Sequence, residues 1–240
     1  MAKDRSGDPP APVNTETSRA DIDAFLKRAR ELSPSAEPGR RGRLIFALDA
    51  TMSRQPTWDT ACRLQAEMFR EAAGIGGLEV QLVYYRGFGE CRASKWVANG
   101  EHLANLMSRI DCRGGHTQIE KVLAHARRET ERAKVQALVF IGDAMEEPID
   151  ALAAAAGELG LRGVPVFLFQ EGHDPMAERA FREIVRLTRG AYCRFDAGAA
   201  HQLAELLRAV AAYAAGGLKA LADLSKARGA ATLRLLEQLK

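Results

Sequence analysis

Three segments carry oxygen-bearing side chains of the types that hold a hard metal ion. Asp49, Thr51 and Ser53 occupy alternate positions directly after the apolar run LIFAL, Thr117 follows the glycine-containing stretch CRGGH, and Asp143 follows the apolar run LVFIG. Carboxylate and hydroxyl oxygens are the ligands that Mg²⁺ prefers, in octahedral geometry at about 2.0–2.1 Å. The set contains no thiol or imidazole, so metals that select sulfur or nitrogen ligands are not indicated.

Apolar strand patterns and amphipathic helix patterns alternate along the chain, which predicts an α/β fold. The predicted strands cover residues 43–48, 78–85, 90–93, 136–141, 164–169 and 191–195. The short strand at 90–93 is expected to follow the strand at 78–85 through a hairpin at Gly87-Phe88-Gly89. The predicted helices cover residues 57–73, 100–109, 118–132, 149–160, 175–188 and 199–215. Continuous apolar strands separated by helices indicate a doubly wound, mostly parallel six-stranded sheet with helices on both faces.

This fold predicts where the oxygen-bearing side chains lie. Ligand sites of open parallel sheets form beyond the carboxyl ends of the strands, near the point where the strand order reverses. If the strands at 43–48 and 136–141 are neighbours at that point, the segments with Asp49, Thr117 and Asp143 meet at one edge of the sheet.

In this order the residues resemble the metal-ion-dependent adhesion site (MIDAS) of the von Willebrand factor A (VWA) domain family. The family motif Asp-x-Ser-x-Ser corresponds to Asp49-Ala50-Thr51-Met52-Ser53, its loop threonine to Thr117 and its last aspartate to Asp143. The resemblance implies a Rossmann-like VWA fold and a bound Mg²⁺ or Mn²⁺. It also implies that Asp49 binds the metal mainly through water, that Thr51 and Ser53 ligate it directly, and that Thr117 and Asp143 bind directly or through water.

Two positions depart from the family pattern. Thr51 replaces the usual serine, which keeps the hydroxyl and adds a methyl group. Ala144 replaces the glycine that often follows the last aspartate, so this loop is expected to differ in conformation from that of the family.

The chain divides into four segments. Residues 1–17 are predicted to form a flexible tail, and residues 18–42 an N-terminal helix and a linker. The VWA-like domain is expected at residues 43–215. A C-terminal helical extension at 216–240 either packs on this domain or docks a partner.

Composition narrows the function classes. The 240 residues carry a net charge of +3 from 34 basic and 31 acidic side chains, a balance that argues against a dedicated nucleic-acid binder. No apolar run reaches the length of a membrane span and no apolar signal segment begins the chain. The four cysteines form no CxxC pair, so neither a zinc site nor a disulfide framework is expected. We therefore expect a cytoplasmic protein without a nucleic-acid or membrane partner.

The resemblance implies a protein-binding function rather than catalysis. The family uses such a metal to bind an Asp or Glu carboxylate of a protein partner, and Arg113 and His116 would add positive potential near the site. Intracellular bacterial relatives work beside AAA+ ATPases or in assembly and stress complexes, so an AAA+ ATPase is one expected partner. No general base is indicated beside a nucleophile, so no enzymatic activity is expected.

Three alternatives stay open. Asp49 after a strand is also typical of haloacid-dehalogenase-type phosphatases, although their second aspartate, two residues later, is replaced here by Thr51. The metal site could be vestigial in a structural scaffold. The polar residues could also serve local structure alone: Thr117 with Glu120 fits a helix capping box, and Glu146 and Glu147 would either favour the start of the helix at 149–160 or extend an acidic rim.

Overall fold

Six strands form one sheet in the order β3-β2-β1-β4-β5-β6. The computed structural model describes residues 42–58, 62, 78–195, 210–211 and 214. Its strands are β1 (Gly42–Asp49), β2 (Leu78–Arg86), β3 (Glu90–Ala93), β4 (Ala137–Gly142), β5 (Val166–Glu171) and β6 (Ala191–Phe195). All neighbouring strands are parallel except β3, which runs antiparallel to β2. The predicted mostly parallel six-stranded sheet is confirmed.

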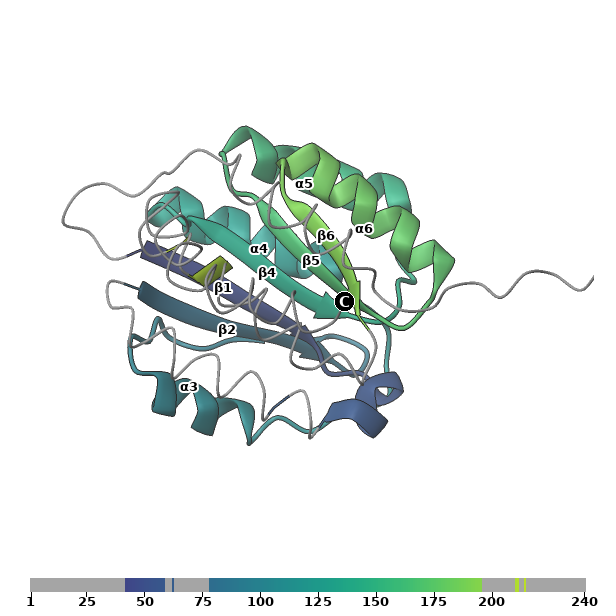
Figure 1. Cartoon of the computed structure of the whole chain (residues 1–240), viewed down its shortest axis with the longest axis horizontal. Coiled ribbons are helices and arrows are strands. Elements are labelled where there is room, and N and C mark those ends of the chain that lie inside the picture. The colour runs from purple at the N-terminus through teal and green to yellow at the C-terminus, as the bar shows by residue number, and fades with distance from the viewer. Residues whose placement is uncertain (1–41, 59–61, 63–77, 196–209, 212–213, 215–240) are drawn as a thin grey trace, which may run out of the picture.

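Helices cover both faces of the sheet (Figure 1). The helices α4 (Ile119–Arg132), α5 (Ile149–Leu161) and α6 (Pro175–Thr188) pack on one face, and α3 (Gly100–Met107) lies on the other. The short 3-10 helix η1 (Met52–Arg54) follows β1. Helical geometry is also found at residues 55–58, 62, 210–211 and 214. Most of the two helices predicted at 57–73 and 199–215 lies outside the described residues, as do both terminal extensions. Within the described part of the chain, no helix is long and apolar enough to cross a membrane.

The central strand β1 is buried on both sides because each face of the sheet has its own core. Leu44, Phe46 and Leu48 point into the core shared with α3, whereas Ile45 and Ala47 point into the core shared with α4, α5 and α6. This two-sided burial explains why the strand reads as an unbroken apolar run rather than as an alternating one. It also places Asp49, the last residue of β1, at the end of a strand that is buried on both faces.

Local capping fixes several helix starts. Asp174 accepts hydrogen bonds from the backbone N–H groups of Met176 and Ala177, and Pro175 stands at the first helical position of α6. Both features stabilise a helix N-terminus because they satisfy or remove donors that have no partner within the helix. The predicted start of this helix at residue 175 is therefore confirmed.

The strand β5 is shifted by two residues from its predicted position at 164–169. Pro165 has no backbone N–H, so it cannot continue the ladder as a donor, although its carbonyl accepts a hydrogen bond from β4 at 3.0 Å. At the other end the polar residues Gln170 and Glu171 remain in the strand, because their buried side chains find hydrogen-bond partners.

Candidate metal centre

The two aspartates lie at the same edge of the sheet, because β1 and β4 are neighbours at the point where the strand order reverses. Asp49 ends β1, and Asp143 directly follows β4. The approach is close: a Cβ added at Gly142 would lie 3.4 Å from the Cβ of Asp49. The predicted adjacency of the strands at 43–48 and 136–141 is thus confirmed, and it brings Asp49 and Asp143 together.

The carboxylate of Asp49 is fully buried and held on both oxygens. The backbone N–H of Thr51 donates to Oδ1 at 2.7 Å, and the hydroxyl of Tyr85 donates to Oδ2 at 2.8 Å. Burial raises the pKa of Asp49, and the nearby charge of Asp143 raises it further, while the hydrogen bonds from Thr51 and Tyr85 act in the opposite direction. The site therefore holds two carboxylates in conditions that favour a compensating positive charge.

Tyr85 is a supporting residue that the sequence reasoning missed. It is the register partner of Asp49 in the parallel β1–β2 pair, so the two side chains leave the sheet on the same face. Burial, followed by the charge of Asp49, raises the pKa of Tyr85 well above its usual range. The phenol stays protonated and acts as a donor to the carboxylate.

The hydroxyls of Thr51 and Ser53 form a pair at the carboxyl end of β1. Thr51 has extended backbone geometry and precedes η1, so the chain turns sharply after Asp49. This turn brings Thr51 Oγ1 and Ser53 Oγ to 3.0 Å from each other. Thr51 is buried and Ser53 is exposed, so the pair spans the boundary between the core and the surface.

Thr117 is joined to the loop that follows β4. Its Oγ1 accepts a hydrogen bond from the backbone N–H of Glu146 at 2.9 Å, and its own N–H donates to Glu146 Oε2 at 2.9 Å. The preceding segment lies beside the end of β1, since the N–H of Arg113 donates to the carbonyl of Ala50 at 3.0 Å. The three predicted segments therefore meet at one edge of the sheet.

The prediction that Thr117 and Glu120 form a capping box at the start of α4 is wrong. The N-cap residue of α4 is Gln118, which makes no side-chain capping hydrogen bond. The N–H of Glu120 instead donates to Glu147 Oε1 at 2.8 Å. Because the cap comes from a loop 27 residues away, the hydroxyl of Thr117 is not used to start the helix.

Glu146 and Glu147 hydrogen-bond at the start of α4, a role that the sequence reasoning did not anticipate. Their carboxylates accept hydrogen bonds from the N–H groups of Thr117 and Glu120. Negative charge at a helix N-terminus is stabilised by the helix dipole and by the free N–H groups there. These two residues fasten the loop after β4 to the loop before α4.

A buried ion pair between Arg54 and Glu171 lies next to the site, and the sequence reasoning missed it. Arg54 is 1% exposed, and its guanidinium contacts Glu171 Oε2 with Nε at 3.0 Å and Nη2 at 2.9 Å. Its Nη1 also donates to the carbonyl of Asp49 at 3.2 Å. Arg54 therefore links the end of β5 to the end of β1, and its charge is neutralised by Glu171.

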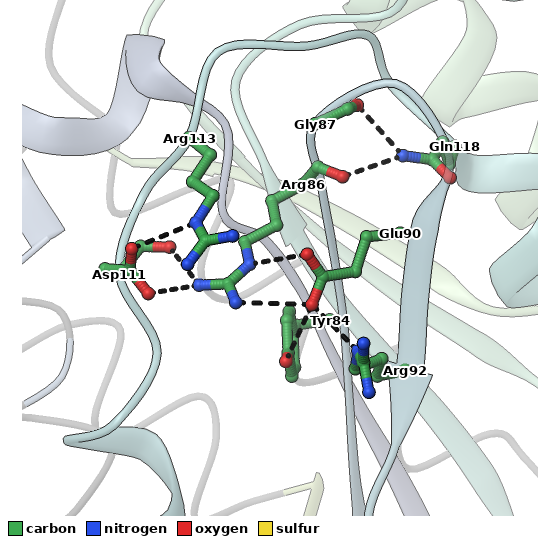
Figure 2. Close-up of polar contacts among 8 residues, drawn as sticks. All are labelled: Tyr84, Arg86, Gly87, Glu90, Arg92, Asp111, Arg113 and Gln118. Carbon is green, nitrogen blue, oxygen red and sulfur yellow. Dashed lines mark hydrogen bonds and ion pairs between the residues drawn. The ribbon is translucent and has the colours of Figure 1, made fainter.

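A second network fixes the β2–β3 hairpin against the loop before Thr117 (Figure 2). Arg86, at the end of β2, donates from Nε to Glu90 at 3.0 Å and pairs through Nη1 with Asp111. The side-chain amide of Gln118 donates to the carbonyls of Arg86 and Gly87 at 3.3 and 3.2 Å. These contacts join the hairpin to the loop.

Glycines allow this close approach. Gly87 adopts a positive φ of 61°, which confirms the predicted hairpin turn. A Cβ on Gly115 would lie 2.0 Å from the carbonyl oxygen of Gly87, so no larger residue fits there.

Arg113 and His116, which were expected to add positive potential near the site, each pair with a neighbouring acidic side chain. Arg113 pairs with Asp111 at 3.1 Å, and His116 Nδ1 lies 3.1 Å from Glu146 Oε2. Neither side chain directs an unpaired charge at Asp49.

The donor set fits a hard divalent cation. In an octahedron with metal–oxygen distances of about 2.0–2.1 Å, adjacent ligand oxygens lie about 3.0 Å apart, the separation that Thr51 Oγ1 and Ser53 Oγ already have. Asp143 Oδ1 is buried and has no hydrogen-bond partner among the described residues. Among these residues, no group of three or more His, Cys, Asp or Glu side chains is arranged to hold a metal, so a metal here would depend on the hydroxyls.

Comparisons with known proteins support the fold. No protein-family model matches the chain, and no curated protein matches it. Among solved structures, an aerotolerance-related membrane protein from Bacteroides fragilis is similar, with 18% identity, a TM-score of 0.54, and coverage of 69% of this chain and 98% of that one. The SpRpn10 VWA domain has 10% identity, a TM-score of 0.57, and coverage of 70% and 94%.

The human COPII-coat protein Sec24c is also similar, with 13% identity and a TM-score of 0.53, over 77% of this chain and 34% of that protein. At these identities the likeness concerns the fold alone. Together with the strand order and the position of Asp49 and Asp143, it defines the class: this chain has the fold of a VWA domain.

Proposed function

We propose that this chain is a Mg²⁺- or Mn²⁺-dependent module that binds a carboxylate of a protein partner. One observation carries the proposal: two carboxylates and a pair of hydroxyls 3.0 Å apart gather at the switch point of a VWA fold, and one carboxylate oxygen, Asp143 Oδ1, has no partner among the described residues. Thr51 and Ser53 would ligate the metal directly, and Asp143 and Thr117 would bind it directly or through water. Asp49 would act mainly through water, since both of its oxygens already accept hydrogen bonds.

The chemistry of the donors explains the expected ligand. A bound divalent cation supplies a Lewis-acidic position that accepts an anionic oxygen. Neutral hydroxyls from Thr51 and Ser53 withdraw less of its charge than carboxylates would, so an external Asp or Glu side chain is a suitable further ligand.

The surface around the site suits a protein rather than a small anion. Met52, between the two hydroxyl residues, is 52% exposed, and Phe88, at the hairpin tip, is 82% exposed. The Phe88 ring packs edge-on against His116, next to Thr117, with ring centroids 5.2 Å apart. Exposed large apolar side chains beside a polar site are typical of interaction surfaces.

The cellular setting follows from the resemblance given above. We place the module in the cytoplasm, in an assembly or stress complex linked to an AAA+ ATPase, which makes such an ATPase the first partner to test. The near balance of acidic and basic residues supports neither a nucleic-acid nor a membrane partner.

The phosphatase alternative has little support at Asp49. A nucleophilic aspartate must reach the substrate, but this carboxylate is fully buried and hydrogen-bonded on both oxygens. The position of the second catalytic aspartate is occupied by Thr51, whose hydroxyl cannot replace a carboxylate as general acid and base. We therefore propose that the chain is not an enzyme.

Calorimetric titration of the metal-free protein with MgCl₂ and MnCl₂ tests the proposal. We expect saturable binding that Ser53→Ala and Thr51→Val weaken, while Ser108→Ala, an exposed serine at the end of α3, leaves it unchanged. At a metal concentration 100-fold above Kd, the free energy of unfolding should rise by about 2.7 kcal/mol. Absence of binding would leave the scaffold reading, and a metal-dependent phosphatase activity abolished by Asp49→Asn would replace our proposal with the enzyme.

Partner binding is then compared in Mg²⁺ and in EDTA. We expect affinity to fall in EDTA, and to fall by a similar factor when the acidic anchor of the partner is changed to Asn or Gln, because both changes remove the same charge-assisted contact. Equal affinities in the two buffers would move the interaction surface away from the metal centre.

A further inference from the structure

A groove separate from the metal centre runs between the edge strand β3 and the helix α4. Its volume is about 190 Å³. Its walls include Cys91, Arg92 and Ala93 from β3, and Lys121, His125 and Arg128 from α4.

One wall of the groove is an open sheet edge. In the described part of the sheet, β3 neighbours β2 alone, and the N–H of Ser94 donates to the carbonyl of Leu82 at 2.8 Å. Antiparallel strands alternate between hydrogen-bonded and non-hydrogen-bonded pairs, so Arg92 also faces β2, whereas Cys91 and Ala93 direct their N–H and C=O groups away from it. Among the described residues, these outward backbone groups have no hydrogen-bond partner. An edge of this kind is a template for a further strand.

The other wall is positively charged along its length. Lys121 lies at the start of β3, where its Nζ donates to the carbonyl of Gly89 at 3.2 Å. At the other end, Trp96 donates to Glu129 at 2.8 Å, so α4 runs alongside β3 in the same direction. Arg128, one residue before Glu129, lines the groove and has no ion pair or hydrogen bond within the described part of the chain.

The charges of the groove are not neutralised by its own acids. Lys121 donates only to the Gly89 carbonyl and to the Gln118 side-chain amide at 2.8 Å, and to no carboxylate of the described residues. Arg92 pairs with Glu90 at 2.8 Å. Lys121 and Arg128 are therefore two cations that line the groove and have no carboxylate partner among the residues that the structure describes.

We infer that this groove binds an extended, acidic segment of a protein partner, which adds to β3 as a further strand. The outward backbone groups of Cys91 and Ala93 would pair with the segment, and its acidic side chains at alternate positions would point toward Lys121 and Arg128. The two cations are seven residues apart on α4, a rise of about 10.5 Å. Strand positions two and four residues apart are separated by about 7 and 13 Å, so acids at either spacing reach both cations.

This site is independent of the proposed metal function, since it uses no metal ligand. The probe is a capped octapeptide of alternating valine and glutamate with a fluorescent label, titrated against the full chain in EDTA and followed by anisotropy. We expect saturable binding that is weakened about tenfold or more when the glutamates are replaced by glutamines. Loss of Mg²⁺ binding in the earlier titration would leave this result unchanged.

Charge variants locate the site. Lys121→Glu and Arg128→Glu should each weaken peptide binding about tenfold, while Arg179→Glu, an exposed residue of α6, should leave it unchanged. A lysine-containing version of the peptide should bind the wild type less well than the glutamate version and should prefer the two glutamate variants.

A proline variant tests whether the peptide pairs with the outward backbone groups of β3. Ala93→Pro removes an N–H that points away from β2, and proline is tolerated on an edge strand. This variant should lose peptide binding with little change in melting temperature, and hydrogen exchange at Cys91 and Ala93 of the wild type should slow when the peptide is added. The inference is overturned by equal affinity for the glutamate and glutamine peptides, by no saturable binding up to about 1 mM peptide, or by amides at Cys91 and Ala93 that are already protected in the free chain.

Discussion

Removal of one hydroxyl group, in Tyr85→Phe, tests whether Asp49 is held in place by the neighbouring strand. The Tyr85 hydroxyl lies in a fully buried position and donates to Asp49 Oδ2 at 2.8 Å. A hydrogen bond to a charged group contributes about 1.5–3 kcal/mol, and its loss leaves a buried carboxylate oxygen without this donor. For a chain of this size each kcal/mol shifts the melting temperature by about 2–4 °C. We therefore expect the metal-free variant to melt about 3–12 °C below the wild type.

Tyr84→Phe is the matched control on the opposite face of the same strand. The Tyr84 hydroxyl donates to Glu90 at a longer distance of 3.3 Å, and Tyr84 is only half-buried. Its removal should cost less than about 0.5 kcal/mol, as for most surface changes. Urea unfolding with equal slopes for all three proteins would give the free energies directly. If Tyr85→Phe were as stable as Tyr84→Phe, the Tyr85 hydroxyl would not be needed to compensate the buried Asp49 carboxylate, and our account of the support of this site would be wrong.

Three further predictions concern other parts of the structure. Glu171→Gln leaves the buried guanidinium of Arg54 without its anion and should cost about 3–5 kcal/mol in urea unfolding, an expectation that a loss below about 1 kcal/mol would contradict. Burial lowers the pKa of His125, so the unfolded chain binds the proton more readily, and stability should fall as the pH drops below about 6.5; urea unfolding at several pH values should show a smaller fall in His125→Gln. Gly115→Ala places a methyl group against a backbone carbonyl and should cost about 1–3 kcal/mol or more, whereas Gly114→Ala, with open space around it, should be neutral in thermal unfolding.

Much of the fold could be predicted because its signals are local. The strands at 90–93 and 191–195 and the helix at 175–188 have the predicted bounds, since apolar periodicity, turn glycines and a capping aspartate all act over a few residues. The start of β5 was misplaced because valine before Pro165 looks like a strand, although proline lacks the N–H that the ladder needs. Its end was misplaced because the polar residues there are buried by partners far away in the sequence.

The candidate ligands and their supports differ in the same way. Asp49, Thr51 and Ser53 could be found because the turn after a strand forces them together within five positions. Tyr85 and Glu171 could not, because their contacts join residues 36 and 117 positions apart. The one signal that was present for Tyr85 is its position at the end of the next strand, which would have pointed to Asp49 if the parallel register had been known in advance.

The candidate ligands and the residues that support them differ in how many contacts they make in the folded chain. The hydroxyl of Ser53 is exposed, and the free oxygen of Asp143 bonds nothing among the described residues, so their removal deletes few contacts of the folded chain. Two of the supports, by contrast, are buried: Tyr85 in β2 and Arg54 in η1 both hydrogen-bond to Asp49. The backbone N–H of Glu146, an exposed residue, holds the Thr117 hydroxyl. Variants of Ser53 and Asp143 should therefore lose metal binding at nearly constant stability, whereas variants of the buried supports Tyr85 and Arg54 should lose both. If the proposed metal binds, these supports would hold the edge of the sheet in place beforehand, so binding would not have to order the loops as well.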